Sequence, residues 1–152
     1  MKKYLVIGNP IQHSLSPLIH NYWIKKNNIN AIYEKEQIEK NGLENLISKV
    51  KDRKIHGINV TVPFKNDIII HLEKLTPQAE DTQSVNTIYL DEDKVTGHNT
   101  DIDGFRLAIE DIKFDVSKRH ILIVGAGGVV PSIIYSLIKM KAQKIYLTNR
   151  TR

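Results

Sequence analysis

Short apolar stretches bounded by loop signals predict the β-strands of this chain. In the first hundred residues these stretches are either continuous apolar runs or alternate between apolar and polar positions, and helical patterns separate them. Two of them flank the acidic turn 91–93 and predict a hairpin. The expected strands cover residues 4–8, 31–37, 55–62, 84–90 and 94–97.

Apolar residues at helical spacing predict helices between these strands. Ser16 followed by Pro17 is a typical helix start, because serine caps the helix and proline fits its first turn. From there a helix is expected to run to about Asn27, with an apolar face that we assign to the protein core. The apolar sets that define the expected helices are Leu18, Ile19, Tyr22 and Trp23; Leu43, Leu46, Ile47 and Val50; Ile68 to Leu75; and Phe105, Leu107, Ala108 and Ile109.

The last third of the chain forms a second pattern. Residues 120–124 are an apolar strand of the kind found in parallel sheets covered on both faces. A glycine-rich turn, a helix at about 130–141 and a strand at 144–148 follow, which together make a βαβ unit. The predicted fold class is α/β, with the domain boundary in the polar stretch 110–119. It has an N-terminal α/β substrate-binding domain, residues 1–110, and the beginning of a Rossmann-type nucleotide-binding domain, residues 111–152.

Composition and charge narrow the class of protein. With 152 residues, 41% hydrophobic and 26% charged, the chain has the composition of a soluble globular protein of one or two domains. The formal net charge of +5 could point to nucleic acid, but the basic residues are scattered and do not cluster with aromatic ones. There is no cysteine, no apolar run of about 18 residues and no signal-peptide pattern. We expect a cytoplasmic protein that binds neither nucleic acid nor membranes.

Residues 125–129 carry a candidate nucleotide site. Glycines there permit a tight turn and let backbone N–H groups approach a pyrophosphate at the start of a helix. Val130 occupies the third position of the fingerprint, where a small residue is usual. The alternative is a glycine turn that serves only to pack the helix on the sheet, but the strand before it and the helix after it favour a dinucleotide. The residues assigned to the site are Gly125, Ala126, Gly127, Gly128 and Val129.

The end of the following strand predicts which dinucleotide binds. NAD-binding proteins usually carry an acidic residue about 20 residues after the glycines, where it holds the ribose hydroxyls. This chain has Asn149, Arg150 and Thr151 there, and no carboxylate. A planar, permanently charged guanidinium can face a 2′-phosphate, so NADP is favoured over NAD. A solvated arginine at a strand end is the alternative, but it leaves the missing acid unexplained.

Lys65 and Asp101 are the candidate acid–base pair. Each lies on a short polar loop after an apolar strand, within the stretches 57–65 and 97–104. An ammonium and a carboxylate can move a proton on and off a substrate hydroxyl. Combined with a nicotinamide, such proton transfer is the oxidation of an alcohol. Taken singly, Lys65 could equally be a solvent-exposed lysine and Asp101 a helix cap.

Ser14 and Ser16 lie on a loop that leads into a helix. Two hydroxyls and the nearby backbone donors suit a carboxylate ligand. Capping of the helix by Ser16 is the alternative, although it gives Ser14 no role. The six histidines show no metal-ligand spacing, so we assign no metal site.

Several short motifs together resemble the shikimate dehydrogenase family, NADP-dependent enzymes of the route through chorismate to aromatic amino acids. The motifs occur in the order that the family has, and they cover nearly the whole chain. They are Gly8-Asn9-Pro10, Ser14-Leu15-Ser16-Pro17, Asn59-Val60-Thr61-Val62-Pro63-Phe64-Lys65, Val85-Asn86-Thr87, Gly97-His98-Asn99-Thr100-Asp101 with Gly104, Gly125-Ala126-Gly127-Gly128 and Asn149-Arg150-Thr151.

The resemblance implies reversible reduction of 3-dehydroshikimate to shikimate by NADPH. It places the substrate carboxylate on Ser14 and Ser16, with Thr61 beside them. The ring hydroxyls would be held by Asn86, Lys65 and Asp101. Lys65 would stabilise and protonate the alkoxide that forms as hydride reaches the ketone carbon, and Asp101 would orient it. The implied substrate residues are Ser14, Ser16, Asn59, Thr61, Lys65, Asn86 and Asp101.

Two alternatives stay open beside this function. One is a quinate/shikimate dehydrogenase of broader specificity, and the other is a noncatalytic module that binds a ring acid. Family members continue beyond the position of Arg152, so we expect a fragment that binds NADPH poorly and turns over little by itself. The sequence leaves the oligomeric state open, a homodimer included.

Overall fold

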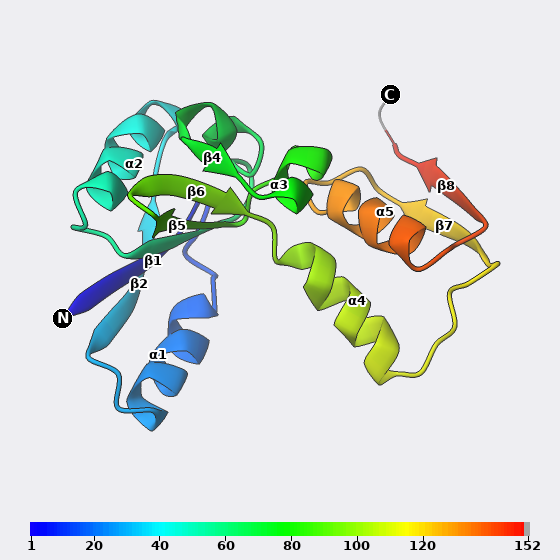
Figure 1. The fold of residues 1–152 in the computed structure, drawn as a ribbon, viewed down its shortest axis with the longest axis horizontal. Helices are drawn as coiled ribbons and strands as arrows, with labels where there is room; N and C mark the ends of the chain where they lie inside the picture. The colour runs from blue at the N-terminus through cyan, green and yellow to red at the C-terminus, as the bar shows by residue number, and fades with distance from the viewer. Residues whose placement is uncertain (151–152) are drawn as a thin grey trace.

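The computed structural model describes residues 1–150 of the chain (Figure 1). Strands and helices alternate along most of this length, which confirms the predicted α/β class. In chain order the elements are β1 (Lys2–Gly8), α1 (Ser16–Lys26), β2 (Ala31–Gln37), the 3-10 helix η1 (Lys40–Gly42), α2 (Leu43–Lys51), β3 (Gly57–Val60), the 3-10 helix η2 (Asp67–His71), β4 (Lys74–Leu75), α3 (Pro77–Thr82), β5 (Thr87–Asp91), β6 (Lys94–His98), α4 (Asp101–Asp111), β7 (His120–Val124), α5 (Val130–Lys139) and β8 (Lys144–Thr148).

Six strands form the larger sheet, in the order β2-β1-β3-β5-β6-β4. β1 pairs in parallel with both β2 and β3, and the β5–β6 hairpin continues the sheet in the antiparallel sense. Glu92 and Asp93 form the predicted hairpin turn with φ angles of 46° and 62°, the positive pair that a type I′ turn requires. β7 and β8 make a separate parallel pair at the other end of the molecule, beyond α4 and α5 (Figure 1).

The main core lies between the large sheet and α2. Alternation in β1 divides its side chains between the two faces of the sheet. Leu5 and Ile7 face the main core together with Ile58 of β3, whereas Val6 packs in a smaller cluster with Tyr33 on the other face. The apolar face predicted for α2 is confirmed, since all four of its residues are buried: Leu43, Leu46, Ile47 and Val50.

Ile58 provides a test of this core. Its side chain is only 2% exposed, so Ile58→Ala should leave a cavity and lower the free energy of unfolding by about 2–5 kcal/mol. Ile70 is a matched control because the same side chain is 80% exposed there, and Ile70→Ala should cost no more than about 0.5 kcal/mol. Urea denaturation monitored by circular dichroism measures the free energy of unfolding of both variants. Equal losses of stability would contradict the assigned core.

The apolar face predicted for α1 is wrong. α1 has no buried residue, and Asn21 attaches it to β2 through hydrogen bonds. Its Nδ2 donates to the carbonyl of Tyr33 at 2.7 Å, and its Oδ1 accepts the N–H of Tyr33 at 3.0 Å. Ile24 packs against the Tyr33 cluster, so the side of the helix that faces the sheet is not the predicted one. The predicted core residues are each more than half exposed: Leu18, Ile19, Tyr22 and Trp23.

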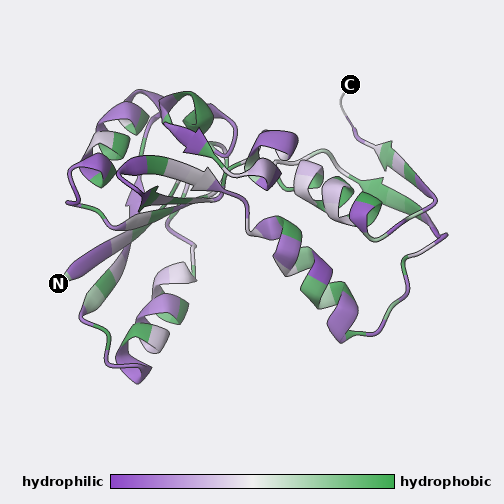
Figure 2. Cartoon of the chain, in the orientation of Figure 1, coloured by the Kyte–Doolittle hydropathy of each residue, from purple (hydrophilic) through white to green (hydrophobic). Residues whose placement is uncertain are grey.

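Two further expectations need correction. The strand predicted to be covered on both faces, β7, is covered on one face only within residues 1–150: Leu122 and Val124 are mostly exposed, whereas Ile121 and Ile123, which alternate with them, are partly buried. Figure 2 shows this strand largely in the hydrophobic colour. The helix predicted at 68–75 is the short η2 followed by β4. The chain extends there because the N–H of Glu73 donates to the carbonyl of Val95, next to the β4–β6 pairing.

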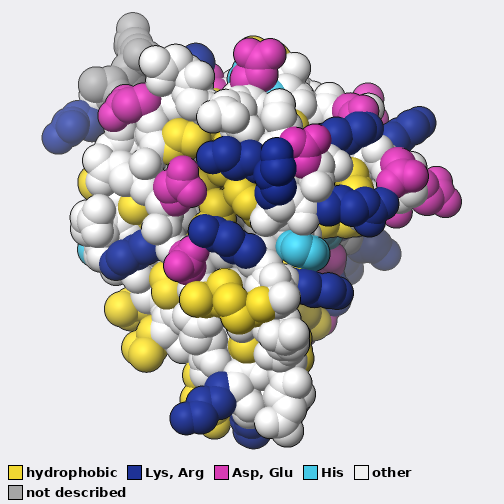
Figure 3. Space-filling view, turned by 90° about the vertical axis from the view of Figure 1, so that its left-hand side faces the viewer, with side chains coloured by type: hydrophobic (Ala, Val, Ile, Leu, Met, Phe, Trp, Pro, Cys, Tyr) yellow, Lys and Arg dark blue, Asp and Glu magenta, His cyan; other side chains and the backbone are white. Residues whose placement is uncertain are grey.

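The surface charge is mixed. On the face in Figure 3, basic side chains are interspersed with acidic ones. Ion pairs at the surface of the protein include Lys3 with Glu34 and Lys51 with Glu73, each at 2.7 Å. Pairs at such exposed positions contribute little to stability. In the part of the chain that the structure describes, no helix has the length and apolar character needed to cross a bilayer.

Candidate active site

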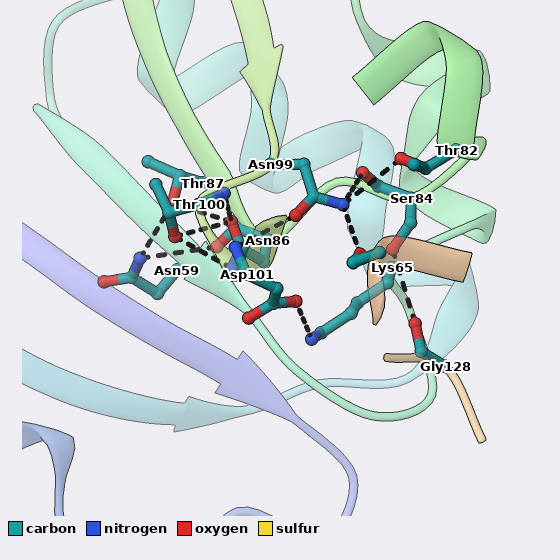
Figure 4. Close-up of polar contacts among 11 residues, drawn as sticks. Asn59, Lys65, Thr82, Ser84, Asn86, Thr87, Asn99, Thr100, Asp101 and Gly128 are labelled. Atoms are coloured by element: carbon teal, nitrogen blue, oxygen red, sulfur yellow. Dashed lines mark hydrogen bonds and ion pairs between the residues drawn. The ribbon is translucent and has the colours of Figure 1, made fainter. Parts of the chain in front are cut away.

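Lys65 and Asp101 meet in one ion pair. Nζ of Lys65 donates to Oδ2 of Asp101 at 2.7 Å, and the two side chains are only 15% and 24% exposed. Lys65 follows β3, and Asp101 is the first residue of α4, where the positive end of the helix dipole favours a carboxylate. Figure 4 shows the two side chains pointing toward each other. The residue at the capping position of α4 is Thr100 and not Asp101, and the Lys65 side chain is mostly buried, so the simple explanations of a capping aspartate and a solvated lysine are both disfavoured.

The ion pair lines an open cleft of about 630 Å³. Amide, hydroxyl, cationic and anionic groups converge on it, which suits a small polyhydroxylated acid. Six of the seven predicted substrate residues line the cleft, and Ser14 is the exception. The lining residues are Val6, Ser16, His20, Asn59, Val60, Thr61, Lys65, Asn86, Thr87, Thr100 and Asp101.

Ser14 lines a neighbouring groove along α1 and β2 instead. Its Oγ accepts the N–H of Ser16 at 3.3 Å, so its hydroxyl orients the start of α1. Ser16, the alternative capping residue, makes no capping hydrogen bond and faces the cleft. The role of Ser14 at the substrate carboxylate stays a prediction.

Two asparagines connect four segments around the cleft. Oδ1 of Asn86 accepts the N–H of Thr100 at 2.9 Å and the hydroxyl of Thr87 at 3.0 Å, while its Nδ2 donates to the Thr100 hydroxyl at 2.9 Å. Nδ2 of Asn59 donates to the Thr87 hydroxyl at 3.2 Å, and its Oδ1 accepts the hydroxyl of Tyr33 at 2.6 Å. Because every bond fixes the orientation of the next group, the amides present defined faces to the cleft.

His20 and Tyr33 are residues near the site that the sequence analysis did not assign to it. Burial raises the pKa of Tyr33 well above its ordinary range, so its hydroxyl stays protonated and donates to Asn59. The ring of His20 stacks on Tyr33, with centroids 4.1 Å apart and planes 12° from parallel. Desolvation lowers the pKa of His20, which favours the neutral ring. The spacing of Ser16 and His20, four residues apart on one helix, was the signal that could have found it.

The glycine turn has one residue in a backbone conformation that favours glycine. Gly125 has a φ of +108°, a region that residues with side chains rarely adopt. A Cβ added at Gly127 or Gly128 would meet no atom of residues 1–150 within 4 Å. Contact with neighbouring atoms therefore does not explain these two glycines, and the open space beside them leaves their backbone accessible to a ligand. Val130, at the third fingerprint position, is buried at the start of α5.

A second cleft, of about 450 Å³, lies beside this turn. Val124 and Gly125 line it together with Thr148, Asn149 and Arg150 from the end of β8. The predicted 2′-phosphate residue and the glycine turn thus share one cleft. Thr151, also assigned to the cofactor, lies outside the described residues. Within residues 1–150 no three His, Asp or Glu side chains are grouped closely enough to hold a metal ion.

The fold and the two clefts define a class of protein, an α/β protein with a polar cleft and a dinucleotide-type glycine turn. Residues 6–88 match the family model of the shikimate dehydrogenase substrate-binding domain. The chain belongs to this family.

Several relatives agree with that assignment. Shikimate dehydrogenase (NADP(+)) of Pelagibacter ubique is 55% identical over 150 residues, which are 99% of this chain and 57% of that protein. The crystal structure of Aquifex aeolicus shikimate dehydrogenase superposes with a TM-score of 0.92 at 39% identity, covering 99% of this chain and 56% of that one. Thermus thermophilus shikimate 5-dehydrogenase in complex with NADP(H) and shikimate gives 0.89 at 28% identity, with 99% and 57% covered. The chain spans about half the length of the curated relatives it matches.

Proposed function

We propose that this chain forms the substrate site and the beginning of the cofactor site of an NADP-dependent oxidoreductase that interconverts 3-dehydroshikimate and shikimate. The observation that carries the proposal is the Lys65–Asp101 ion pair in a polar cleft, 2.7 Å between charged atoms. Relatives bear the name shikimate dehydrogenase (NADP(+)), and the Thermus thermophilus relative was crystallised with NADP(H) and shikimate. In this role the protein acts in the cytoplasm on a soluble metabolite of aromatic amino acid biosynthesis.

The groups in the cleft divide the work between binding and proton transfer. Ser16 and Thr61 offer hydroxyls to the substrate carboxylate, and Asn86 offers its amide to a ring hydroxyl. The bound cofactor supplies or accepts the hydride. Lys65 donates a proton to the oxygen on which negative charge develops, or takes one in the reverse direction. Asp101 holds the ammonium in place and stays available to a neighbouring hydroxyl.

The choice of NADP rests on Arg150 and the glycine turn. Arg150 lines the same cleft as Gly125, so its guanidinium would hold the 2′-phosphate of a nucleotide bound at the turn. The backbone N–H groups at the start of α5 suit the pyrophosphate.

A binding experiment on the chain tests the substrate site. Shikimate should bind in the cleft, and Ser16→Ala should weaken that binding by about tenfold or more, because a hydrogen bond to a charged group contributes about 1.5–3 kcal/mol. Ser48→Ala is the matched control, since the Ser48 hydroxyl donates to the Glu44 carbonyl on α2, away from the cleft. Isothermal titration calorimetry measures the affinities, and amide chemical shifts locate the ligand.

The outcome of the same titration with Ser14→Ala decides between its two roles. Weaker shikimate binding would mean that the Ser14 hydroxyl contacts the substrate carboxylate. Unchanged binding would mean that this hydroxyl only orients the start of α1, by accepting the N–H of Ser16. No shikimate-induced shifts at Ser16, Thr61 or Asn86 in the unsubstituted chain would count against the proposed substrate site.

A further inference from the structure

Asn99 lies at the centre of a buried polar seam, which we define as Thr82, Ser84, Asn99, Ser132 and Ser136. The Asn99 side chain is fully buried, and all of its polar atoms are bonded. Its Nδ2 donates to the carbonyl of Ser84 at 2.9 Å and to Oγ of Ser132 at 2.8 Å. Its Oδ1 accepts the N–H of Asp101 at 3.0 Å. One amide therefore joins the loop before β5, the helix α5 and the first residue of α4.

The seam also reaches the glycine turn. Ser132 and Ser136 are one turn apart on the same side of α5 and are both buried. Ser136 Oγ donates to the carbonyl of Ile102 at 2.8 Å, and Ser84 Oγ donates to the carbonyl of Gly128 at 3.4 Å. Figure 4 shows Asn99 and Ser84 between Asp101 and Gly128. The nucleotide turn and the acid–base pair are thus attached to one another through the seam.

Because Asn99 is buried, its hydrogen bonds require one particular arrangement of their partners. A buried amide that lost its partners would be strongly unfavourable, so Asn99 is stable only where the carbonyl, the serine and the Asp101 N–H stand in one arrangement. A packed apolar side chain would tolerate small shifts of α4 against α5, and a fully bonded amide does not. The position of the Asp101 backbone is therefore fixed relative to α5.

We infer that Asn99 is a positioning residue for the proposed dehydrogenation. It holds Asp101 at the place where the carboxylate meets Lys65, and through Ser132 it ties that place to the helix that follows the nucleotide turn. The inference rests on the proposed function only for its consequence in catalysis. The link between Asn99, Ser132 and the ion pair is a property of the chain itself.

Two serines of α5 provide a matched pair of variants. Ser132→Ala and Ser136→Ala each remove one buried hydrogen bond of 2.8 Å, but only Ser132 is bonded to Asn99. We expect Ser132→Ala to shift the 15Nζ resonance of Lys65 in the free chain and to weaken shikimate binding by about fivefold, the equivalent of one neutral hydrogen bond. Ser136→Ala should change both less than Ser132→Ala does, even if the two variants lose similar stability in urea, because the bond that it removes goes to the Ile102 carbonyl and not to Asn99. Asn99→Ala should change the Lys65 resonance and the shikimate affinity more than Ser132→Ala does. If the Asn99→Ala protein does not fold, the two serine variants test the inference without it.

Each result has a distinct meaning. A Lys65 resonance that responds equally to both serine variants, or to neither, would overturn the positioning role. If the unsubstituted chain fails to bind shikimate while Ser132→Ala alone still moves the Lys65 resonance, the proposed substrate is wrong and the coupling stands. If Ser132→Ala weakens shikimate binding but leaves the 15Nζ resonance of Lys65 unchanged, the inference is also overturned. Asn99 would then affect binding without changing the ion pair.

Discussion

Replacement of Lys65 by alanine is expected to reduce kcat for shikimate oxidation by about 10²- to 10⁴-fold, the contribution typical of general acid–base catalysis. KM should change much less, because the lost interaction matters mainly in the transition state. This expectation rests on the position of Lys65. Its ammonium contacts Asp101 and lines the same cleft as the polar groups assigned to the substrate. Steady-state formation of NADPH, measured on the protein with a complete cofactor domain, gives both constants.

Lys40→Ala is the control for this prediction. Lys40 also forms an ion pair with an aspartate, at 2.6 Å from Asp67, but the pair lies on the surface and lines neither cleft. Its loss should leave kcat unchanged. Turnover of Lys65→Ala close to that of Lys40→Ala would remove Lys65 from the mechanism.

Arg150→Asp is expected to reverse the cofactor preference. The substitution removes the guanidinium from the cleft beside Gly125 and introduces the carboxylate that usually holds the ribose hydroxyls of NAD. Loss of charge-assisted hydrogen bonds to a 2′-phosphate should lower kcat/KM for NADP by about tenfold or more, while the value for NAD rises. The measurement compares the two cofactors at saturating shikimate.

The same charge change elsewhere serves as the control. Arg53 pairs with Asp93 at the surface, and Arg53→Asp should leave the ratio of the two cofactors as it is. An unaltered ratio in Arg150→Asp would mean that the 2′-phosphate contacts another part of the protein.

The fold could be predicted from the sequence where each element has one apolar side. α2 carries its four core residues on a single face, and the β5–β6 hairpin has a turn between two alternating strands, so both predictions are confirmed. α1 has apolar residues around much of its circumference, and periodicity cannot tell which of them faces the sheet. The helix predicted at 68–75 failed because its pairing partner, β6, lies more than 20 residues further along the chain.

The sequence allowed the residues of the site to be predicted, but not the hydrogen bonds that hold them in place. The motifs named Lys65, Asn86 and Asp101, and the structure brings these together at one cleft. The bond from Tyr33 to Asn59 and the bond from Asn99 to Ser132 join residues 26 and 33 positions apart. Such contacts depend on how helices and strands pack, which no spacing along the chain encodes.

The contact between Lys65 and Asp101 has a consequence for affinity. Opposite charges that are already in contact need not be gathered by an arriving molecule, so the entropy of bringing them together is lost during folding and not during association. A ring alcohol that enters has only to exchange its water for a place beside them. For the proposed substrate, discrimination among similar ring acids would then depend on the amides and hydroxyls around the pair.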